Sequence, residues 1–237
     1  MKKIYFKDLL KFTSKILIKV GLDIKSAKNL SYCLCETSLR GVDSHGVKLF
    51  PHYLNSALSK RKNIKPKFKF KSKYPGVITL DADNAFGHLA GLTAVKYGSK
   101  IANKLGICAV SVINSSHPGA MASIALSAAR KGIICLAFTH ADSLIRSTNG
   151  KRSFFGTNPI CFAVPRMEKE PYCLDMATSI ISWNKLLEMK KIKSNISSII
   201  GSDLNGKDTK ILNKIVSLNP TGDYKGFGLA SMVEILC

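Results

Sequence analysis

The sequence predicts an α/β protein that begins with a helical segment. Apolar residues at helical spacing over 6–20 and over 24–39 predict two N-terminal helices, each followed by a glycine that can end it. Farther along, strand-like runs at 107–114 and 133–139 flank a helical stretch at about 120–131, an order typical of α/β proteins. With 46% hydrophobic residues, the 237-residue chain can form a sizeable core.

Between these regions the pattern predicts one more helix, two strands and a long helix. The third helix is expected from near Gly46 toward Leu58. Within the basic run 60–73, the lysines of 65–73 alternate with Pro66, Phe68, Phe70 and Ser72, which predicts an edge strand protected by charge, and "VITL" predicts a short strand after it. A helix over 89–105 should end at Gly106. Because the runs at 107–114 and 133–139 are continuously apolar, we expect both to be buried strands.

The last third of the chain continues the mixture of strands and helices. Strand-like runs occupy "FFGTNPICFAVP" and "YCLDMATS", and a helix is expected over 180–190. A turn at "SDLNGKDT" precedes an apolar C-terminal helix, "KGFGLASMVEIL".

Composition and charge indicate which partners, metals and location to expect for this chain. The net charge of +21 is compatible with a nucleic-acid partner, but a lysine-solvated surface explains it as well, and we consider nucleic acid the less favoured reading. Seven scattered cysteines without paired spacing give no zinc motif, so we expect no metal. No apolar run reaches the length of a membrane helix or the pattern of a signal peptide, so we expect a cytoplasmic protein outside the membrane.

Two histidines lie in similar surroundings at breaks between predicted elements. His45 is in Ser-His-Gly, and His117 is in Ser-His-Pro-Gly after a predicted strand, where α/β sheets commonly bind ligands. Each is a candidate acid or base, although each is equally explained as a histidine that caps its own loop. The other three are expected to be surface or loop residues: His52, His88 and His140. Asp175 can orient an imidazole or cap the helix that follows it.

Dinucleotide-binding and phosphate-loop glycine motifs are both absent. Five other motifs, in order, carry a resemblance: "RGVDSHGV…PHY", "NSSHPGA", "GTNP", "LDMATS" and "YKGFGLA". With them the chain resembles the malate/L-lactate dehydrogenase family over essentially its whole length. The resemblance implies a non-Rossmann, three-layer fold with a mixed sheet, a homodimer, and an oxidoreductase that uses NAD or NADP on 2-oxo or 2-hydroxy acids.

The same resemblance assigns roles to residues. It implies that His45 is the acid/base, that Ser44 assists it, and that His117 belongs to the active site. Cofactor contacts are implied for Asp175, Met176 and Ala177, with Asp175 also a candidate to orient His45, and for Lys225 and Gly226. Residues 1–75 are then the helical, substrate-side segment, and 76–237 the NAD(P)-binding α/β domain, shortened at its C-terminus.

The chain departs from the family pattern at Leu49, where an arginine is common four residues after the motif histidine. A leucine cannot hold a substrate carboxylate as an arginine does. This departure and the early C-terminus favour one alternative, an inactive relative that keeps the fold. The other alternative is the basic nucleic-acid-binding protein suggested by charge alone.

Overall fold

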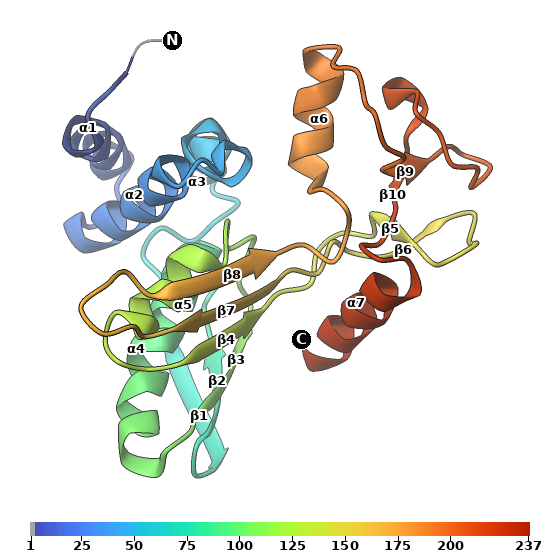
Figure 1. Ribbon diagram of the computed structural model, residues 1–237. Helices are drawn as coiled ribbons and strands as arrows, with labels where there is room; N and C mark the ends of the chain where they lie inside the picture. The colour runs from blue at the N-terminus through green and yellow to red at the C-terminus, as the bar shows by residue number, and fades with distance from the viewer. Residues whose placement is uncertain (1–2) are drawn as a thin grey trace. The chain divides into compact units, whose positions relative to one another are not determined.

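The computed structural model describes residues 3–237, which form two compact units. The first unit comprises the chain up to Cys135 together with Ala163–Cys173, and the second comprises Leu136–Phe162 and Leu174–Cys237. Each combines helices with strands, so the predicted α/β class is confirmed (Figure 1). Within the described residues, no helix is both long and apolar enough to cross a membrane.

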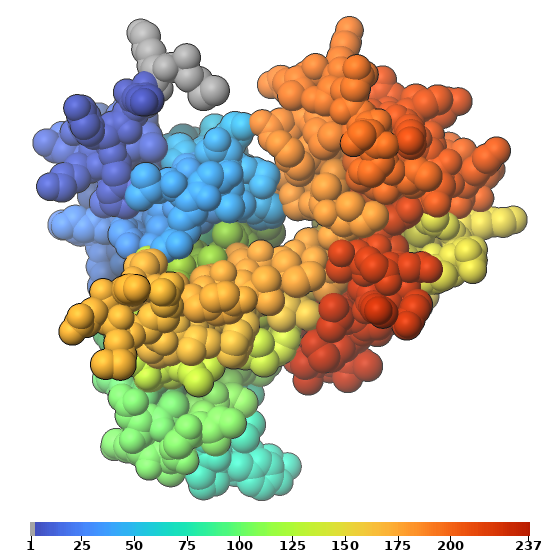
Figure 2. All heavy atoms as spheres, in the orientation of Figure 1, coloured from blue at the N-terminus to red at the C-terminus, as the bar shows by residue number. Residues whose placement is uncertain are grey.

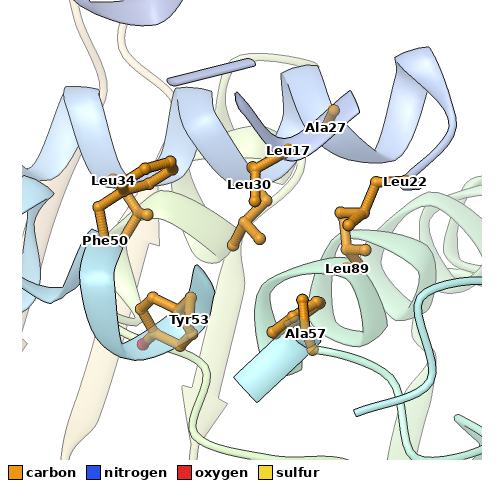
Figure 3. Packing of buried hydrophobic residues seen from close by; sticks show 10 residues of the cluster. Leu17, Leu22, Ala27, Leu30, Leu34, Phe50, Tyr53, Ala57 and Leu89 are labelled. Carbon is orange, nitrogen blue, oxygen red and sulfur yellow. The ribbon is translucent and has the colours of Figure 1, made fainter. Parts of the chain in front are cut away.

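Three helices and one hydrophobic cluster open the first unit. Helices α1 (Phe6–Lys19) and α2 (Ile24–Leu39) match the predicted ranges, and the Asp23 carboxylate caps α2 by accepting from two backbone N–H groups. These two helices and α3 (Phe50–Leu58) pack their apolar faces together (Figure 3). The buried members of this cluster are Leu17, Leu22, Ala27, Leu30, Leu34, Phe50, Tyr53, Ala57, Phe86 and Leu89.

The third helix begins later than its sequence pattern predicts. Residues before Phe50 form two short 3-10 turns, η1 (Asp43–His45) and η2 (Val47–Leu49), instead of continuing the α-helix toward Gly46. The reason is local, because Gly46 between the turns has φ −96° and ψ −142°, a conformation outside the helical region. The segment that carries His45 is therefore a pair of turns held between two helices.

A mixed three-stranded sheet follows, in the order β1-β2-β3. Strand β1 (Lys69–Tyr74) pairs antiparallel with β2 (Val77–Asp81), and β2 pairs parallel with β3 (Ala109–Ile113) after the crossover helix α4 (Gly87–Leu105). The predicted edge strand is confirmed: its alternating lysines are exposed, while Phe70 stacks on Tyr97 of α4 with ring centroids 3.9 Å apart. In Figure 2 the cyan atoms of β1 and β2 accordingly border the green atoms of α4.

The prediction that β3 and β4 (Cys135–Phe138) are buried strands is wrong. Ile113 of β3 is 45% exposed and Leu136 of β4 is 56% exposed, and neither strand contains a buried residue. A continuous apolar run predicts cover on both faces, whereas the alternating exposure of β3 shows that this strand has cover mainly on one. For β3 that cover includes α4, and the helix α5 (Ala122–Ala129) follows the strand in the chain.

The second unit has short strands and two helices. Its sheet runs in the order β6-β5-β10-β9, from β5 (Ile145–Arg146), β6 (Ser153–Phe155), β9 (Gly201–Ser202) and β10 (Ser217–Leu218). A third sheet, whose strands contain residues of both units, has the order β4-β7-β8, with β7 (Ile160–Val164) and β8 (Tyr172–Met176). Helix α6 (Trp183–Lys191) contributes Leu186 to a small core, the turn η3 (Leu212–Lys214) precedes β10, and α7 (Tyr224–Leu236) ends near the C-terminus.

Candidate active site

The structure brings the two motif histidines of the first unit together. The ring centroids of His45 and His117 lie 5.7 Å apart, with the ring planes tilted by 31°. The hydroxyl oxygen of Ser44 lies 3.0 Å from Nδ1 of His45. Three of the residues proposed from sequence therefore form one polar cluster, which we call the imidazole cluster.

Gly46 explains why a glycine follows His45. A Cβ added at Gly46 would overlap the Ser38 hydroxyl and lie 2.9 Å from the backbone nitrogen of the same residue, near the end of α2. The Ser38 hydroxyl accepts a hydrogen bond from the backbone N–H of Val47, 3.0 Å away. Only a residue without a side chain permits this approach, so the motif glycine fixes the turn that carries His45 against α2.

His117 is held by a loop that packs on the start of α4. A Cβ added at Gly87 would lie 2.7 Å from the carbonyl carbon of His117 and 2.7 Å from Cα of Pro118. The backbone N–H of Gly87 donates to the Ser116 hydroxyl, which donates in turn to the carbonyl of Ala85. Close backbone contact and two hydrogen bonds thus place His117 beside the turn of His45.

Two further aromatic residues complete the imidazole cluster, and sequence reasoning missed both. Tyr53 of α3 lies with its hydroxyl oxygen 2.7 Å from Nδ1 of His117. His88, expected to be a surface or loop residue, is instead 1% exposed in α4, with its ring centroid 5.0 Å from that of Tyr53. Its burial depends on the loop at Gly119, which no local pattern near His88 reveals.

Burial determines the protonation state of two histidines of the cluster, His45 and His88. It lowers the pKa of His45 below the ordinary value of 6.5, so this imidazole is largely neutral at pH 7. For His88, burial first and the neighbouring His117 and His45 second lower the pKa to about 3. The imidazole cluster is therefore an environment in which a neutral imidazole is favoured and an added proton is readily given up.

The proposed cofactor segments meet each other in the second unit. After Asp175, Met176 and Ala177 at the end of β8, the backbone of Thr178 bonds to Thr157 and to Thr221, with N···O distances of 2.9 Å in both cases. A Cβ added at Gly226 would lie 2.7 Å from the carbonyl oxygen of Thr178. Three motifs distant in sequence, "GTNP", "LDMATS" and "YKGFG", thus converge around Thr178.

The contacts of these segments answer two questions that the sequence left open: whether Asp175 caps a helix and whether "GTNP" is only a turn. Asp175 does not cap the helix that follows, because α6 begins at Trp183 and the Ser182 hydroxyl caps it. Nor is "GTNP" a simple turn. Its Asn158 is fully buried, donates to the carbonyl of Ala230 and to the carboxylate of Glu234 in α7, and accepts from the backbone N–H of Ala141.

A separate ionic network in the first unit involves none of the imidazole-cluster residues. The buried carboxylate of Glu36 pairs with Arg130, which also contacts Glu170 at 2.6 Å, and Glu170 pairs with Arg40. The network borders a surface cavity of about 460 Å³ near Arg166. Because each guanidinium is paired with a carboxylate, the network ties α2 to the β7–β8 connection.

Comparison with known proteins agrees with this arrangement of motifs. Residues 4–237 match the family described as malate/L-lactate dehydrogenase. The chain belongs to the malate/L-lactate dehydrogenase family. It is 34% identical to a malate dehydrogenase of Pyrococcus abyssi, over 97% of this chain and 66% of that protein, and 29% identical to an Escherichia coli ureidoglycolate dehydrogenase (NAD(+)), over 93% and 63%.

Solved structures of family members share the fold. The crystal structure of malate dehydrogenase from Entamoeba histolytica superposes with a TM-score of 0.92 at 29% identity, covering 99% of this chain and 69% of that one. The chain spans about two thirds of the length of the curated family members it matches.

Leu49, at the position where an arginine is expected from the family resemblance, has a structural role here. Its side chain is partly buried and packs against the hydrophobic cluster of α1, α2 and α3. The neighbouring Lys48 is exposed. This member of the family therefore has an apolar contact with the core at a position where the resemblance predicts a substrate-binding cation.

Proposed function

We propose that this chain catalyses hydride transfer between NAD(P)H and a 2-oxo acid, with the imidazole cluster as its proton-transfer site. The observation that carries the proposal is the approach of His45 and His117 to within 5.7 Å from two motifs far apart in the chain. Membership of a family of dehydrogenases supports the same reaction class. The names of the relatives include malate and ureidoglycolate dehydrogenases, so a small hydroxy or oxo acid is the proposed substrate class.

The chemistry requires a proton donor at the substrate oxygen. When bound, the reduced nicotinamide supplies the hydride that the carbonyl carbon accepts, and negative charge develops on the oxygen. Protonated His45 donates to that oxygen, and in the oxidative direction neutral His45 accepts the proton. The Ser44 hydroxyl at Nδ1 orients the ring, so that Nε2 is the nitrogen that exchanges the proton. A role for Asp175 in orienting His45 remains a prediction.

The second unit has groups that fit a dinucleotide. Lys225 is exposed at the first turn of α7, and the N-terminal end of a helix favours an anion such as a pyrophosphate. Asp175 is exposed at the end of β8, where a carboxylate can accept hydrogen bonds from ribose hydroxyls. Met176, Ala177 and Gly226 complete the proposed contacts. No glycine-rich turn links β2 to α4, which supports a non-Rossmann mode of binding.

We also propose which parts of the chain bind the substrate and the cofactor. Residues 1–75 contribute His45 to the substrate side, and 76–237 contribute the cofactor segments. The homodimer and the choice between NAD and NADP remain predictions from the family resemblance.

Cofactor binding and turnover test the proposal separately. We would titrate the full chain with NADH and NADPH by fluorescence, and then assay a panel of 2-oxo acids that includes oxaloacetate and pyruvate. The variant His45→Ala should lower kcat about 10²-fold or more and leave cofactor binding intact. The matched control His140→Ala alters an exposed histidine outside the cluster and should keep turnover.

Each alternative predicts a different result. Cofactor binding without turnover on any 2-oxo acid would favour an inactive relative. Absence of binding at millimolar cofactor would contradict the proposal. DNA binding that weakens steeply with salt would favour the alternative of a basic nucleic-acid-binding protein.

A further inference from the structure

The phenol of Tyr53 makes a direct contact with one catalytic candidate. Its hydroxyl oxygen lies 2.7 Å from Nδ1 of His117, and the two rings are within 17° of parallel. The side chain comes from the core-facing side of α3 and is only 2% exposed. In Figure 3 its ring lies among the apolar side chains of the cluster, and its oxygen points away from Leu30 and Leu89.

The direction of this hydrogen bond follows from the surroundings of the hydroxyl. Burial raises the pKa of Tyr53, so the phenol keeps its proton. Across residues 3–237, the only hydrogen-bond partner of this hydroxyl is Nδ1 of His117. A buried O–H group without an acceptor is strongly disfavoured. The Tyr53 hydroxyl therefore donates to the lone pair on Nδ1 of His117, and the ring proton of His117 lies on Nε2.

We infer that Tyr53 is a positioning residue that holds His117 as a neutral, Nε2-protonated imidazole. A proton added at Nδ1 would reverse the hydrogen bond and leave the buried phenol without an acceptor. A second positive charge beside a protonated His45, 5.7 Å away, would also be disfavoured. The hydroxyl of Ser44 sets no such limit on His45, because a serine hydroxyl can accept from a protonated ring or donate to a neutral one.

The two histidines then have different roles. Resting on the proposed function, His117 donates an N–H hydrogen bond to the substrate oxygen without changing its own charge, and His45 alone gives and takes the proton. Neutral imidazole donors of this kind polarise a carbonyl and stabilise the charge that develops on its oxygen. Tyr53 acts only through His117, since its hydroxyl is engaged with that ring.

Nuclear magnetic resonance of the full chain tests the inference without substrate. Histidine nitrogens labelled with ¹⁵N at pH 7 distinguish the Nε2-protonated ring, the Nδ1-protonated ring and the doubly protonated ring by their chemical shifts. His117→Gln identifies the signals of His117 by their disappearance. We expect the neutral Nε2-protonated form for His117. Either of the other two forms in the unmodified protein would overturn the inference.

A hydroxyl deletion supplies the second measurement. Tyr53→Phe should shift the His117 signals toward the Nδ1-protonated or doubly protonated form and lower kcat for 2-oxo acid reduction about tenfold. The KM for NADH should not change. The control Tyr32→Phe removes a hydroxyl bonded to Glu36 and should leave the His117 signals unaltered. Unaltered signals in Tyr53→Phe would overturn the inference, whereas the expected signals without turnover would count against the proposed function alone.

Discussion

Gly119 offers a sharp test of how His88 is buried. This glycine has φ +72°, in the left-handed region, and faces the ring of His88. A Cβ added there would overlap Nε2 of that ring and lie 2.9 Å from its Cε1 atom. Because the His88 side chain is 1% exposed in a helix, it has little room to move aside. Gly119→Ala therefore combines backbone strain with a steric clash.

The two effects can be estimated and separated. A left-handed alanine costs about 1–2 kcal/mol, and overpacking a filled core costs about 1–3 kcal/mol. The expected loss in free energy of unfolding for Gly119→Ala is their sum, about 2–5 kcal/mol. Gly106, at the end of α4, has φ +87° and no atom within 4 Å of an added Cβ. Gly106→Ala is thus a matched control that carries the backbone strain alone.

Urea denaturation of both variants measures the difference. We expect Gly119→Ala to lose about 1–3 kcal/mol more than Gly106→Ala. In a His88→Ala background the excess should disappear, because the clashing ring is gone. Equal losses for the two glycine variants, or an excess that persists without the imidazole, would refute the packing of His88 against the loop that carries His117.

Three further predictions concern ionisation and buried hydrogen bonds. The rate of 2-oxo acid reduction should fall as pH rises through the pKa of His45. Because burial lowers this pKa, the midpoint of the pH profile of kcat/KM should lie below pH 6.5. A midpoint above that value would contradict His45 as the proton donor. Between pH 6.5 and about 3, the unfolded chain binds a proton that folded His88 does not, so His88 should reduce the free energy of unfolding by about 1.4 kcal/mol per pH unit as pH falls. His88→Gln should show a correspondingly shallower acid destabilisation in urea titrations, and an unchanged slope would count against a neutral His88. Asn158→Ala leaves the N–H of Ala141 and the carbonyl of Ala230 without this partner and should lower the free energy of unfolding by about 2–4 kcal/mol. Asn158→Asp keeps the acceptor for Ala141 but places a buried carboxylate against that of Glu234, so it should lose at least as much; a loss within about 0.5 kcal/mol for either variant would contradict the role of Asn158 as a buried link.

Local signals predicted the helices because their causes are local. The bounds of α1 and α2 follow from apolar periodicity, from the Asp23 cap and from glycines at 21 and 41 with positive φ. The late start of α3 has a local cause as well, but it is one that hydrophobic periodicity does not encode. Gly46 is fixed by its approach to Ser38, a contact across a turn that becomes visible only once α2 is in place.

Contacts between distant segments explain what the sequence could not predict. His88 is buried because the loop near Gly119 packs on it, and Asn158 is buried because α7 supplies its partners. Apolar runs likewise predicted β3 and β4 as strands but not their exposure, because the pattern of a strand does not reveal what lies on its faces. Two glycines permit the close contacts around this loop: Gly87 is approached by the backbone of His117 and Pro118, and Gly119 by the ring of His88.

Leu49 and Tyr53 both contact the hydrophobic cluster, and Tyr53 also reaches the candidate active site. The two residues are four apart, a spacing that places side chains on the same side of a helix, and both contact the hydrophobic cluster. Leu49 ends in methyl groups inside that contact, whereas Tyr53 extends a single polar atom through it to His117. A phenylalanine would fill the same space, and one hydrogen bond contributes only about 1 kcal/mol to stability. The tyrosine hydroxyl therefore matters less for holding the helices together than for choosing which nitrogen of His117 carries the proton.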